Sequence, residues 1–343
     1  MTAHRVVQWA TGTIGVRSLR AVVEHPGLAL AGVYVHSPDK AGRDAGALCG
    51  LGEVGVTATQ DIADIVQLGA DCVLYMPLVC DLNEVCRLLE SGANIVTTRG
   101  EFHHPPSMDP VVRKRVEAAC ERGGTSIHST GSSPGFITEA VPLVLTSIAR
   151  RLDSLTIDEY ADLSQRPSPE LLFGVMGFGT EPGRFDKGRL KHGLTSFGPS
   201  LRLVGEALSL PLDSLDADGE FATARRRTDI AAGTLGEGTV AAQRLTVTGL
   251  RAGRPLLRFR ATWYCTTDLA PAWELHDTGW HVSVEGDAPL EVGLRMPVPL
   301  DRMAEVSPSY TANRAVNAVP FVCAAEPGIR TTTELPQITA TLG

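Results

Sequence analysis

The sequence contains no apolar run of about 18 residues or more, the length that a membrane-spanning helix requires. It also has no excess of positive charge, because 31 Lys and Arg residues stand against 39 Asp and Glu residues and the net charge is −8. A mildly acidic chain lacks the basic footprint that is typical of nucleic-acid-binding proteins. We therefore predict a protein that neither spans a membrane nor binds nucleic acid.

Paired cysteines are absent as well. The chain has seven cysteines, an odd number, and no Cys-x-x-Cys pair, which argues against a disulfide framework and against a structural zinc site. The adjacent His103 and His104 are accompanied by no HExxH motif or other ligand cluster, so we predict no metal site. Reduced thiols, and an N-terminus without the apolar core of a signal peptide, predict a cytoplasmic location.

The 343 residues, of which 43% are hydrophobic, suit two globular domains. In the first third, short apolar runs alternate with helical patterns, which predicts a doubly wound parallel sheet of the Rossmann type. After Phe136, closely spaced strands with alternating polarity, as in LRFRATWY, predict an α+β domain built on an open, mostly antiparallel sheet. Residues 168–205 are typical of loops and short helices. We expect a dinucleotide-binding domain over 1–135, a substrate and dimerisation domain over 136–306, and a C-terminal helix and tail over 307–343 that pack back on the Rossmann domain.

A glycine-rich turn follows the first strand. The strand VVQW runs directly into ATGTIG, which is the dinucleotide fingerprint GxGxxG with alanine at its first position. Gly12 would let a pyrophosphate approach the backbone, Gly15 would let the next helix pack closely, and the start of that helix offers N–H groups to phosphates. The alternative is a glycine turn that serves packing only. The residues of this predicted cofactor site are Ala10, Thr11, Gly12, Thr13, Ile14 and Gly15.

The tip of the second strand bears on the choice between NAD and NADP. NAD selectivity usually relies on an acidic residue at this tip, whereas the residue here is His36. Ser37, Lys40 and Arg43 follow and suit a 2′-phosphate, so we predict NADP. Asp39 leaves NAD use open, and a solvated basic turn is the alternative interpretation.

Other residues follow later strands at the same sheet edge, where ligands of parallel sheets bind. These candidates for cofactor binding are Met76 and Pro77 after the third strand, Thr98 and Gly100 after the fourth, and Asn317 on a helix over 310–325.

Glu101 lies directly after the fourth strand, where the nicotinamide is expected. A hydride-transferring enzyme needs a group that moves protons beside the hydride, and a partly buried glutamate suits this task. A surface carboxylate is the alternative, and His103 and His104 are more typical of a loop than of an acid–base pair. We expect Phe136, Tyr160, Phe173 and Met176 to line an apolar substrate pocket, although core packing is an equal alternative.

Four segments together resemble a known family. WATGTIG, GVYVHSPDKAGRDAG, STGSSPGF and NRAVNAVPFVCAAEPGI are similar to the dihydrodipicolinate-reductase-like superfamily, in the branch of 2,4-diaminopentanoate dehydrogenase and the native amine dehydrogenases. The resemblance covers nearly the whole chain. The ExHHxxKxDxPSGT stretch of true dihydrodipicolinate reductases is absent, so lysine biosynthesis is not expected.

The resemblance implies an NAD(P)-dependent amine dehydrogenase, which converts small ketones or aldehydes and ammonia to amines, and the reverse. In that branch a glutamate after the nicotinamide-flanking strand handles the amine, and Glu101 matches its position. The resemblance also implies a homodimer. Two alternatives stay open: an NADP-dependent imine or carbonyl reductase that uses no ammonia, and a non-catalytic NADP-binding redox sensor.

Overall fold

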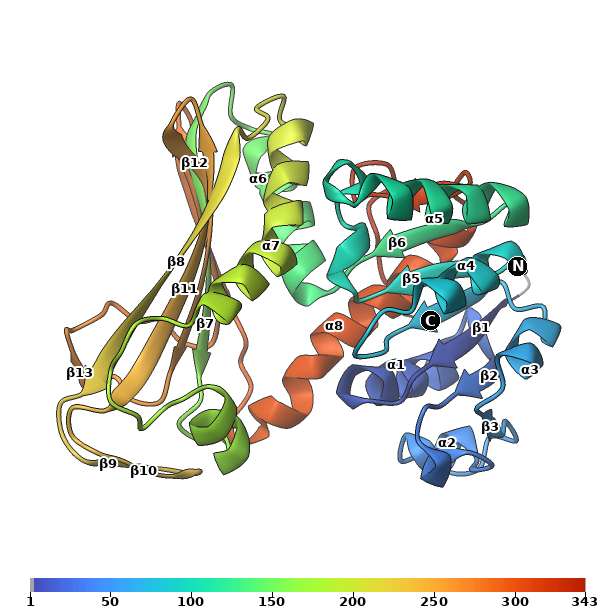
Figure 1. Ribbon diagram of the computed structural model, residues 1–343, viewed down its shortest axis with the longest axis horizontal. Coiled ribbons are helices and arrows are strands. Elements are labelled where there is room, and N and C mark those ends of the chain that lie inside the picture. The colour runs from blue at the N-terminus through green and yellow to red at the C-terminus, as the bar shows by residue number, and fades with distance from the viewer. Residues whose placement is uncertain (1–2, 343) are drawn as a thin grey trace. The chain divides into compact units, whose positions relative to one another are not determined.

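The computed structural model describes residues 3–342. The chain divides into two compact units, one made of the residues up to Phe136 together with those from Ser307 onward, the other of Ile137–Val306. Each unit contains its own seven-stranded sheet (Figure 1). Within the described residues, no helix combines the length and the apolar character needed to cross a membrane.

The sheet of the first unit is entirely parallel, with the strand order β16-β6-β5-β4-β1-β2-β3. Its strands are β1 (His4–Trp9), β2 (Leu28–Tyr34), β3 (Ala58–Thr59), β4 (Cys72–Tyr75), β5 (Asn94–Thr97), β6 (Ser126–Ser129) and β16 (Gly328–Arg330). The chain winds outward from β1 in one direction and then from β4 in the other. The carboxyl ends of β1 and β4 therefore flank the point where such sheets bind ligands, and the predicted Rossmann-type sheet is confirmed.

Helices cover both faces of this sheet. The helices of the unit are α1 (Thr13–Glu24), α2 (Ala45–Leu48), α3 (Ile62–Gln67), α4 (Leu82–Glu90), α5 (Pro110–Gly123) and the larger part of α8 (Leu300–Cys323). Buried side chains of α3, α4 and α5 pack on one face, and those of α1 and α8 pack on the other. This two-sided cover explains why the central strands are largely apolar on both faces.

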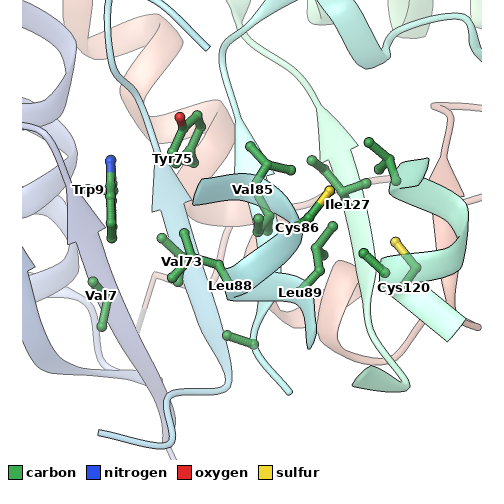
Figure 2. Packing of buried hydrophobic residues seen from close by; sticks show 14 of the residues in the cluster. Val7, Trp9, Val73, Tyr75, Val85, Cys86, Leu88, Leu89, Cys120 and Ile127 are labelled. Carbon is green, nitrogen blue, oxygen red and sulfur yellow. The ribbon is translucent and has the colours of Figure 1, made fainter. Parts of the chain in front are cut away.

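The hydrophobic core beneath α4 is formed by the strand side chains that point to that face of the sheet. Val7 and Trp9 of β1 and Val73 of β4 belong to the same hydrophobic cluster as Leu88 and Leu89 of α4, and Leu88 lies beside Val73 (Figure 2). All of these side chains are essentially inaccessible. Each buried leucine contributes roughly 1.5–3 kcal/mol to stability, so this packing holds α4 on the sheet.

The sheet of the second unit has the order β13-β8-β11-β12-β7-β14-β15. Its strands are β7 (Leu152–Asp162), β8 (Ser214–Ala224), β11 (Val240–Arg251), β12 (Arg254–Tyr264), β13 (Leu269–Ala270), β14 (Gly279–Gly286) and β15 (Leu290–Arg295), and β9 (Thr228–Ile230) pairs with β10 (Gly233–Leu235) in a separate ribbon. Neighbouring strands are antiparallel except β12 and β7. The predicted open, mostly antiparallel sheet is confirmed.

One face of this sheet carries α7 (Lys187–Ala207), which packs on β8, β11 and β12 (Figure 1); the shorter α6 (Val141–Thr146) contacts α7 and β14. The Phe197 ring stacks on Phe259 with 4.0 Å between centroids. The prediction of loops and short helices over residues 168–205 is wrong for its second half, because α7 is a continuous helix of 21 residues. Its glycines and Pro199 resemble loop residues in the sequence, but Gly193 and Gly198 let the helix approach the sheet, where a Cβ would lie 2.6 and 2.7 Å from leucine side chains.

Candidate functional site

The turn after β1 is held in an uncommon conformation. Ala10, at the first position of the fingerprint, has φ of 71°, in the left-handed region that costs a non-glycine residue about 1 kcal/mol or more. The buried side-chain amide of Gln8 donates to the carbonyl oxygens of Trp9, Ala10 and Leu74, and the Ser18 hydroxyl donates to Gln8 in turn. This network stabilises the strained turn and fixes the direction of the Ala10 carbonyl.

The glycines of the fingerprint differ in what surrounds them. A Cβ on Gly15 would lie 2.1 Å from the Ala10 carbonyl oxygen, so only glycine fits where α1 meets the turn. A Cβ on Gly12 would meet no protein atom within 4 Å. The requirement for glycine at position 12 is therefore not imposed by the protein itself, and the open space beside it suits the close approach of a ligand.

The beginning of α1 offers its N–H groups to a ligand rather than to a side chain. Aspartates cap α3, α4 and α5, with side chains that accept from the first backbone N–H groups of each helix. Gly12 is the N-cap of α1 and supplies no side chain, and the first turn of α1 contains no acidic residue. Uncapped N–H groups and the partial positive charge of a helix N-terminus form an anion site, so these residues fit the pyrophosphate of a dinucleotide.

A pocket of about 390 Å³ opens at the carboxyl ends of β1 and β4. It is lined by residues from the ends of three strands: Ala10, Thr11, Gly12, His36, Ser37, Lys40, Met76, Pro77, Leu78 and Val79. Eight of these belong to the residues that the sequence predicted for the cofactor. Leu78 and Val79 do not; although large and apolar, their side chains are 90% and 74% exposed at the rim.

The segment after β2 brings the positive charge of Lys40 to the glycine-rich turn. Tyr34 stacks on Trp9 with 3.7 Å between ring centroids, and His36 meets the Tyr34 ring edge-on. The Lys40 ammonium donates to the carbonyl oxygen and the hydroxyl of Thr11, at 3.0 and 3.3 Å. Arg43 is exposed and is not among the lining residues. Lys40 therefore places a positive charge at the phosphate end of the pocket, with Arg43 further out on the same segment.

Glu101 lies in a short 3₁₀ turn, Gly100–Phe102, directly after β5. Phe102 is completely buried and anchors this turn in the core. The side chain of Glu101 is 41% exposed and accepts two hydrogen bonds from the Arg99 guanidinium, with Nη2–Oε1 at 2.6 Å and Nε–Oε2 at 3.3 Å. The third arm of Arg99 reaches the Leu78 carbonyl oxygen, so the carboxylate is joined to the rim of the pocket through one side chain.

Other predicted residues of the first unit lie outside the pocket. Thr98, Gly100 and Asn317 are partly buried but do not line it, and Thr13 and Ile14 belong to the first turn of α1. His103 and His104 are each 2% exposed, and Nδ1 of His104 lies 2.6 Å from the Ser107 hydroxyl. Both imidazoles are thus part of the packing behind the Glu101 turn. Within residues 3–342, no group of three or more His, Cys, Asp or Glu residues could hold a metal ion.

The predicted substrate residues are divided between the two units. Phe136, the last residue of the first unit's opening segment, has the Arg314 guanidinium 5.7 Å from its ring centroid. Phe173 and Met176 pack against a hydrophobic cluster of the second unit. Tyr160 lines a separate hollow with His276, Trp280 and other residues of β14 and β15. Strand register pairs Tyr160 with Thr262, on the face opposite to Phe259 and α7.

Burial and charge raise the pKa values of two groups near the Glu101 turn. Burial, and then the negative charge of Glu101, raise the pKa of the Cys80 thiol to about 12. Burial also raises the pKa of Tyr75, whose hydroxyl donates to Glu84. A thiol and a phenol with raised pKa values stay protonated near neutral pH, so the ionisable pair at this end of the pocket is Arg99 and Glu101.

Two contributions to this site carried little signal in the sequence. The Arg99–Glu101 pair depends on a turn that brings residues two apart face to face, and the exposed Leu78 and Val79 follow the predicted Met76 and Pro77 without any motif. Gln8 was a visible signal, because it is a polar residue inside an apolar strand. The result is a pocket of about 390 Å³ with an anion site beside Gly12 and a carboxylate joined to its rim through Arg99.

Comparisons with known proteins agree with this geometry. Residues 136–343 match the family model described as the 2,4-diaminopentanoate dehydrogenase C-terminal domain. The chain is 28% identical over 344 residues to an amine dehydrogenase of Streptomyces virginiae, covering 96% of this chain and 95% of that protein. It is 21% identical over 159 residues to 2,4-diaminopentanoate dehydrogenase of Acetoanaerobium sticklandii, covering 46% and 43%. In fold it is similar to the structure of an amine dehydrogenase from Mycobacterium smegmatis, with a TM-score of 0.74, 19% identity and coverage of 98% and 97%.

Proposed function

From the premise that the chain belongs to the 2,4-diaminopentanoate dehydrogenase family, we propose that it is an NAD(P)-dependent amine dehydrogenase. It reductively aminates small ketones or aldehydes with ammonia and catalyses the reverse oxidative deamination of amines. Family membership and the relative that is similar over almost the full length support the oxidoreductase class and the amine as substrate. The use of ammonia is our own inference.

The observation that carries the proposal is the position of Glu101. Its carboxylate is anchored beside the nucleotide pocket by the buried Phe102, and the fork of Arg99 joins it to Leu78 at the rim. A negative charge held there matches the charge that a protonated amine or an iminium carries. A plain carbonyl reductase needs no such anion, because its transition state develops negative charge on oxygen.

The pocket fits a nicotinamide dinucleotide, which when bound supplies or accepts the hydride. The open side of Gly12 and the uncapped start of α1 suit the pyrophosphate. We propose NADP as the preferred form. The Lys40 ammonium lies beside Thr11 in the lining of the pocket, and Ser37 and Arg43, which belong to the same segment, suit a 2′-phosphate. His36 replaces the acidic residue that would favour NAD, and NAD remains the second cofactor candidate.

We assign two roles to Glu101: it transfers protons, and it stabilises the positive charge of the iminium. A carboxylate has about four lone-pair sites, and Arg99 occupies one on each oxygen, which leaves outward sites for the N–H groups of ammonium. Glu101 takes a proton from ammonium, and the resulting ammonia attacks the carbonyl carbon to give a carbinolamine. Glu101 returns the proton to the carbinolamine hydroxyl, which leaves as water and gives an iminium. The carboxylate, ionised again, stabilises the positive charge of the iminium until the carbon is reduced. In deamination, Glu101 accepts the proton of the amine.

For the substrate we propose a small apolar carbonyl or amine. The charge of the Arg99 guanidinium is already paired with Glu101, so it is not an unpaired cation waiting for a substrate carboxylate. We assign substrate contacts to Phe136, Phe173 and Met176 and assign the second unit to substrate binding. Tyr160 stays a further candidate, and it lines a hollow on the sheet face away from α7.

We further propose that the enzyme is a cytoplasmic homodimer. All seven cysteines of the described residues are free thiols, as in reducing compartments. The face of the second sheet away from α7 offers a polar surface that includes the Asp158–Arg260 ion pair, and isologous packing of such faces gives a two-fold dimer. Sedimentation velocity at micromolar concentration should report a dimer, and a monomer would refute this part.

The activity is tested by following NADPH oxidation with a panel of small ketones and aldehydes, with and without ammonium at alkaline pH. We expect oxidation that depends on ammonium. Turnover with carbonyls alone would favour the plain reductase, and tight NADPH binding without any turnover would favour the redox sensor.

The role of Glu101 is tested by Glu101→Gln. This variant should bind NADPH normally and lose turnover by about a hundredfold or more. Glu117→Gln is the matched control, because Glu117 is also paired with an arginine, Arg113, and similarly exposed, but lies on α5. Near-normal turnover of Glu101→Gln would refute the assignment.

A further inference from the structure

The side chain of Arg99 connects two segments at the pocket. Its side chain is only 29% exposed, and its three donors are shared between the Glu101 carboxylate and the carbonyl oxygen of Leu78, 2.5 Å from Nη1. A guanidinium presents its donors in a rigid planar fork. One arginine therefore fixes the distance and the angle between the carboxylate and the backbone of the rim.

The loop that receives this hydrogen bond has little other support. Its ends are fixed, because Met76 N donates to the Trp9 carbonyl oxygen and Asp81 N donates to the Tyr75 hydroxyl. Across residues 3–342, we find no other hydrogen bond to the backbone of residues 77–80 than the one from Arg99. Leu78 and Val79 project outward at 90% and 74% exposure, so the loop that borders the nucleotide pocket depends on Arg99 for its position.

The backbone on the other side of the link is rigid. Arg99 N donates to the Thr97 hydroxyl, and the Arg99 carbonyl oxygen accepts from the Ser129 hydroxyl. The Thr97 hydroxyl itself donates to the Tyr75 carbonyl oxygen. Residues of strands β4, β5 and β6 thus fix the backbone of Arg99. The guanidinium of Arg99 in turn fixes the positions of Glu101 and of the 77–80 loop.

We propose that Arg99 is a positioning residue for the reaction: it aims the Glu101 carboxylate and holds the 77–80 loop in the same arrangement, so that carboxylate geometry and nucleotide affinity are coupled. This inference rests on the proposed function of Glu101. The titratable groups around Arg99 are Glu101, Cys80 and Tyr75.

The test compares Arg99→Gln and Arg99→Lys with Glu101→Gln. Arg122→Gln is the matched control, because Arg122 also pairs with a glutamate, Glu90, on the surface of the same unit without touching the pocket. For each variant, NADPH affinity is measured by fluorescence titration, and kcat is measured with saturating ammonium and carbonyl.

Arg99→Gln should weaken NADPH binding about three- to tenfold, the factor for one lost hydrogen bond. Its kcat should fall about ten- to a hundredfold through misplacement of the carboxylate. Arg99→Lys keeps the charge but not the planar fork of donors, so its kcat should stay low as well.

Glu101→Gln separates the two proposals. If it abolishes turnover while Arg99→Gln matches Arg122→Gln in NADPH affinity and kcat, the inference about Arg99 is wrong and the function of Glu101 stands. If Glu101→Gln retains turnover, the proposed function of Glu101 fails. A lowered melting temperature of Arg99→Gln with unchanged kcat and NADPH affinity would show a merely structural role and overturn the inference.

Discussion

At the scale of single residues, two glycines of one turn have different roles: Gly15 is needed for the packing of the fold, and Gly12 leaves space for the ligand. Gly15→Ala brings a methyl group to 2.1 Å from the Ala10 carbonyl oxygen, and should lower the free energy of unfolding by about 1–3 kcal/mol. Gly12→Ala meets no protein atom within 4 Å, so its stability should stay near the wild-type value. The same methyl group takes the space assigned to the pyrophosphate, so NADPH affinity should fall by about tenfold or more. Urea unfolding and fluorescence titration of both variants check this, and a Gly12→Ala variant with unchanged affinity would contradict our placement of the pyrophosphate.

The sequence identifies residues well where a motif fixes them. Ala10–Gly12, His36 and Met76 follow directly from the fingerprint and from the rule that ligands lie at the carboxyl ends of strands, and they do line the pocket. It identifies residues less well where a contact depends on one rotamer or one loop. The pairing of Arg99 with Glu101 and the exposure of Leu78 have no pattern of their own, because neither repeats with the period of a strand or a helix.

At the scale of elements, the segment after β2 owes its shape to one carboxylate. The Asp44 side chain accepts from the backbone N–H groups of Gly46, Val54 and Gly55 and so closes the loop 44–55, which follows Lys40 in the chain. These hydrogen bonds, led by that from Val54, lower the pKa of Asp44 below its usual 3.8, against the opposing effect of burial. A lowered folded-state pKa stabilises the fold at pH values above the unfolded pKa, and this stabilisation disappears as the pH falls through the folded-state value.

Asp44→Asn should therefore be less stable than the wild type at neutral pH, and the difference should narrow as the pH falls below about 4. Asp39→Asn is the control, since Asp39 is an exposed carboxylate on the same segment. Urea unfolding of the wild type and both variants across this range measures the effect. A difference that is constant with pH would contradict the assigned role of the Asp44 charge.

Helices and strands can be predicted from the sequence where their apolar residues repeat regularly, with the period of a helix or of a strand. The Rossmann strands are short apolar runs between turn residues and were recognised as such. The helix α7 was missed, because the glycines that fit it against the sheet and its internal Pro199 lower the local helical signal.

At the scale of the whole molecule, the fold and the family both followed from the sequence, and both are confirmed. The alternation of strands and helices determines the first sheet, and the close succession of alternating strands determines the second. The face of the second sheet that Tyr160 occupies could not be predicted, because the side of a strand depends on register with its neighbours and on where α7 packs.

The central claim is that this molecule transfers the nitrogen of ammonia to a carbonyl carbon at the expense of a nicotinamide hydride. The most direct measurement supplies NADPH, a small ketone and nitrogen-15 ammonium to the purified protein and analyses the product by mass spectrometry. Our account predicts an amine that carries the label, formed in equal amount to the NADPH oxidised. An alcohol formed in equal amount to the NADPH oxidised, or an absence of labelled amine across the carbonyl panel, would contradict it.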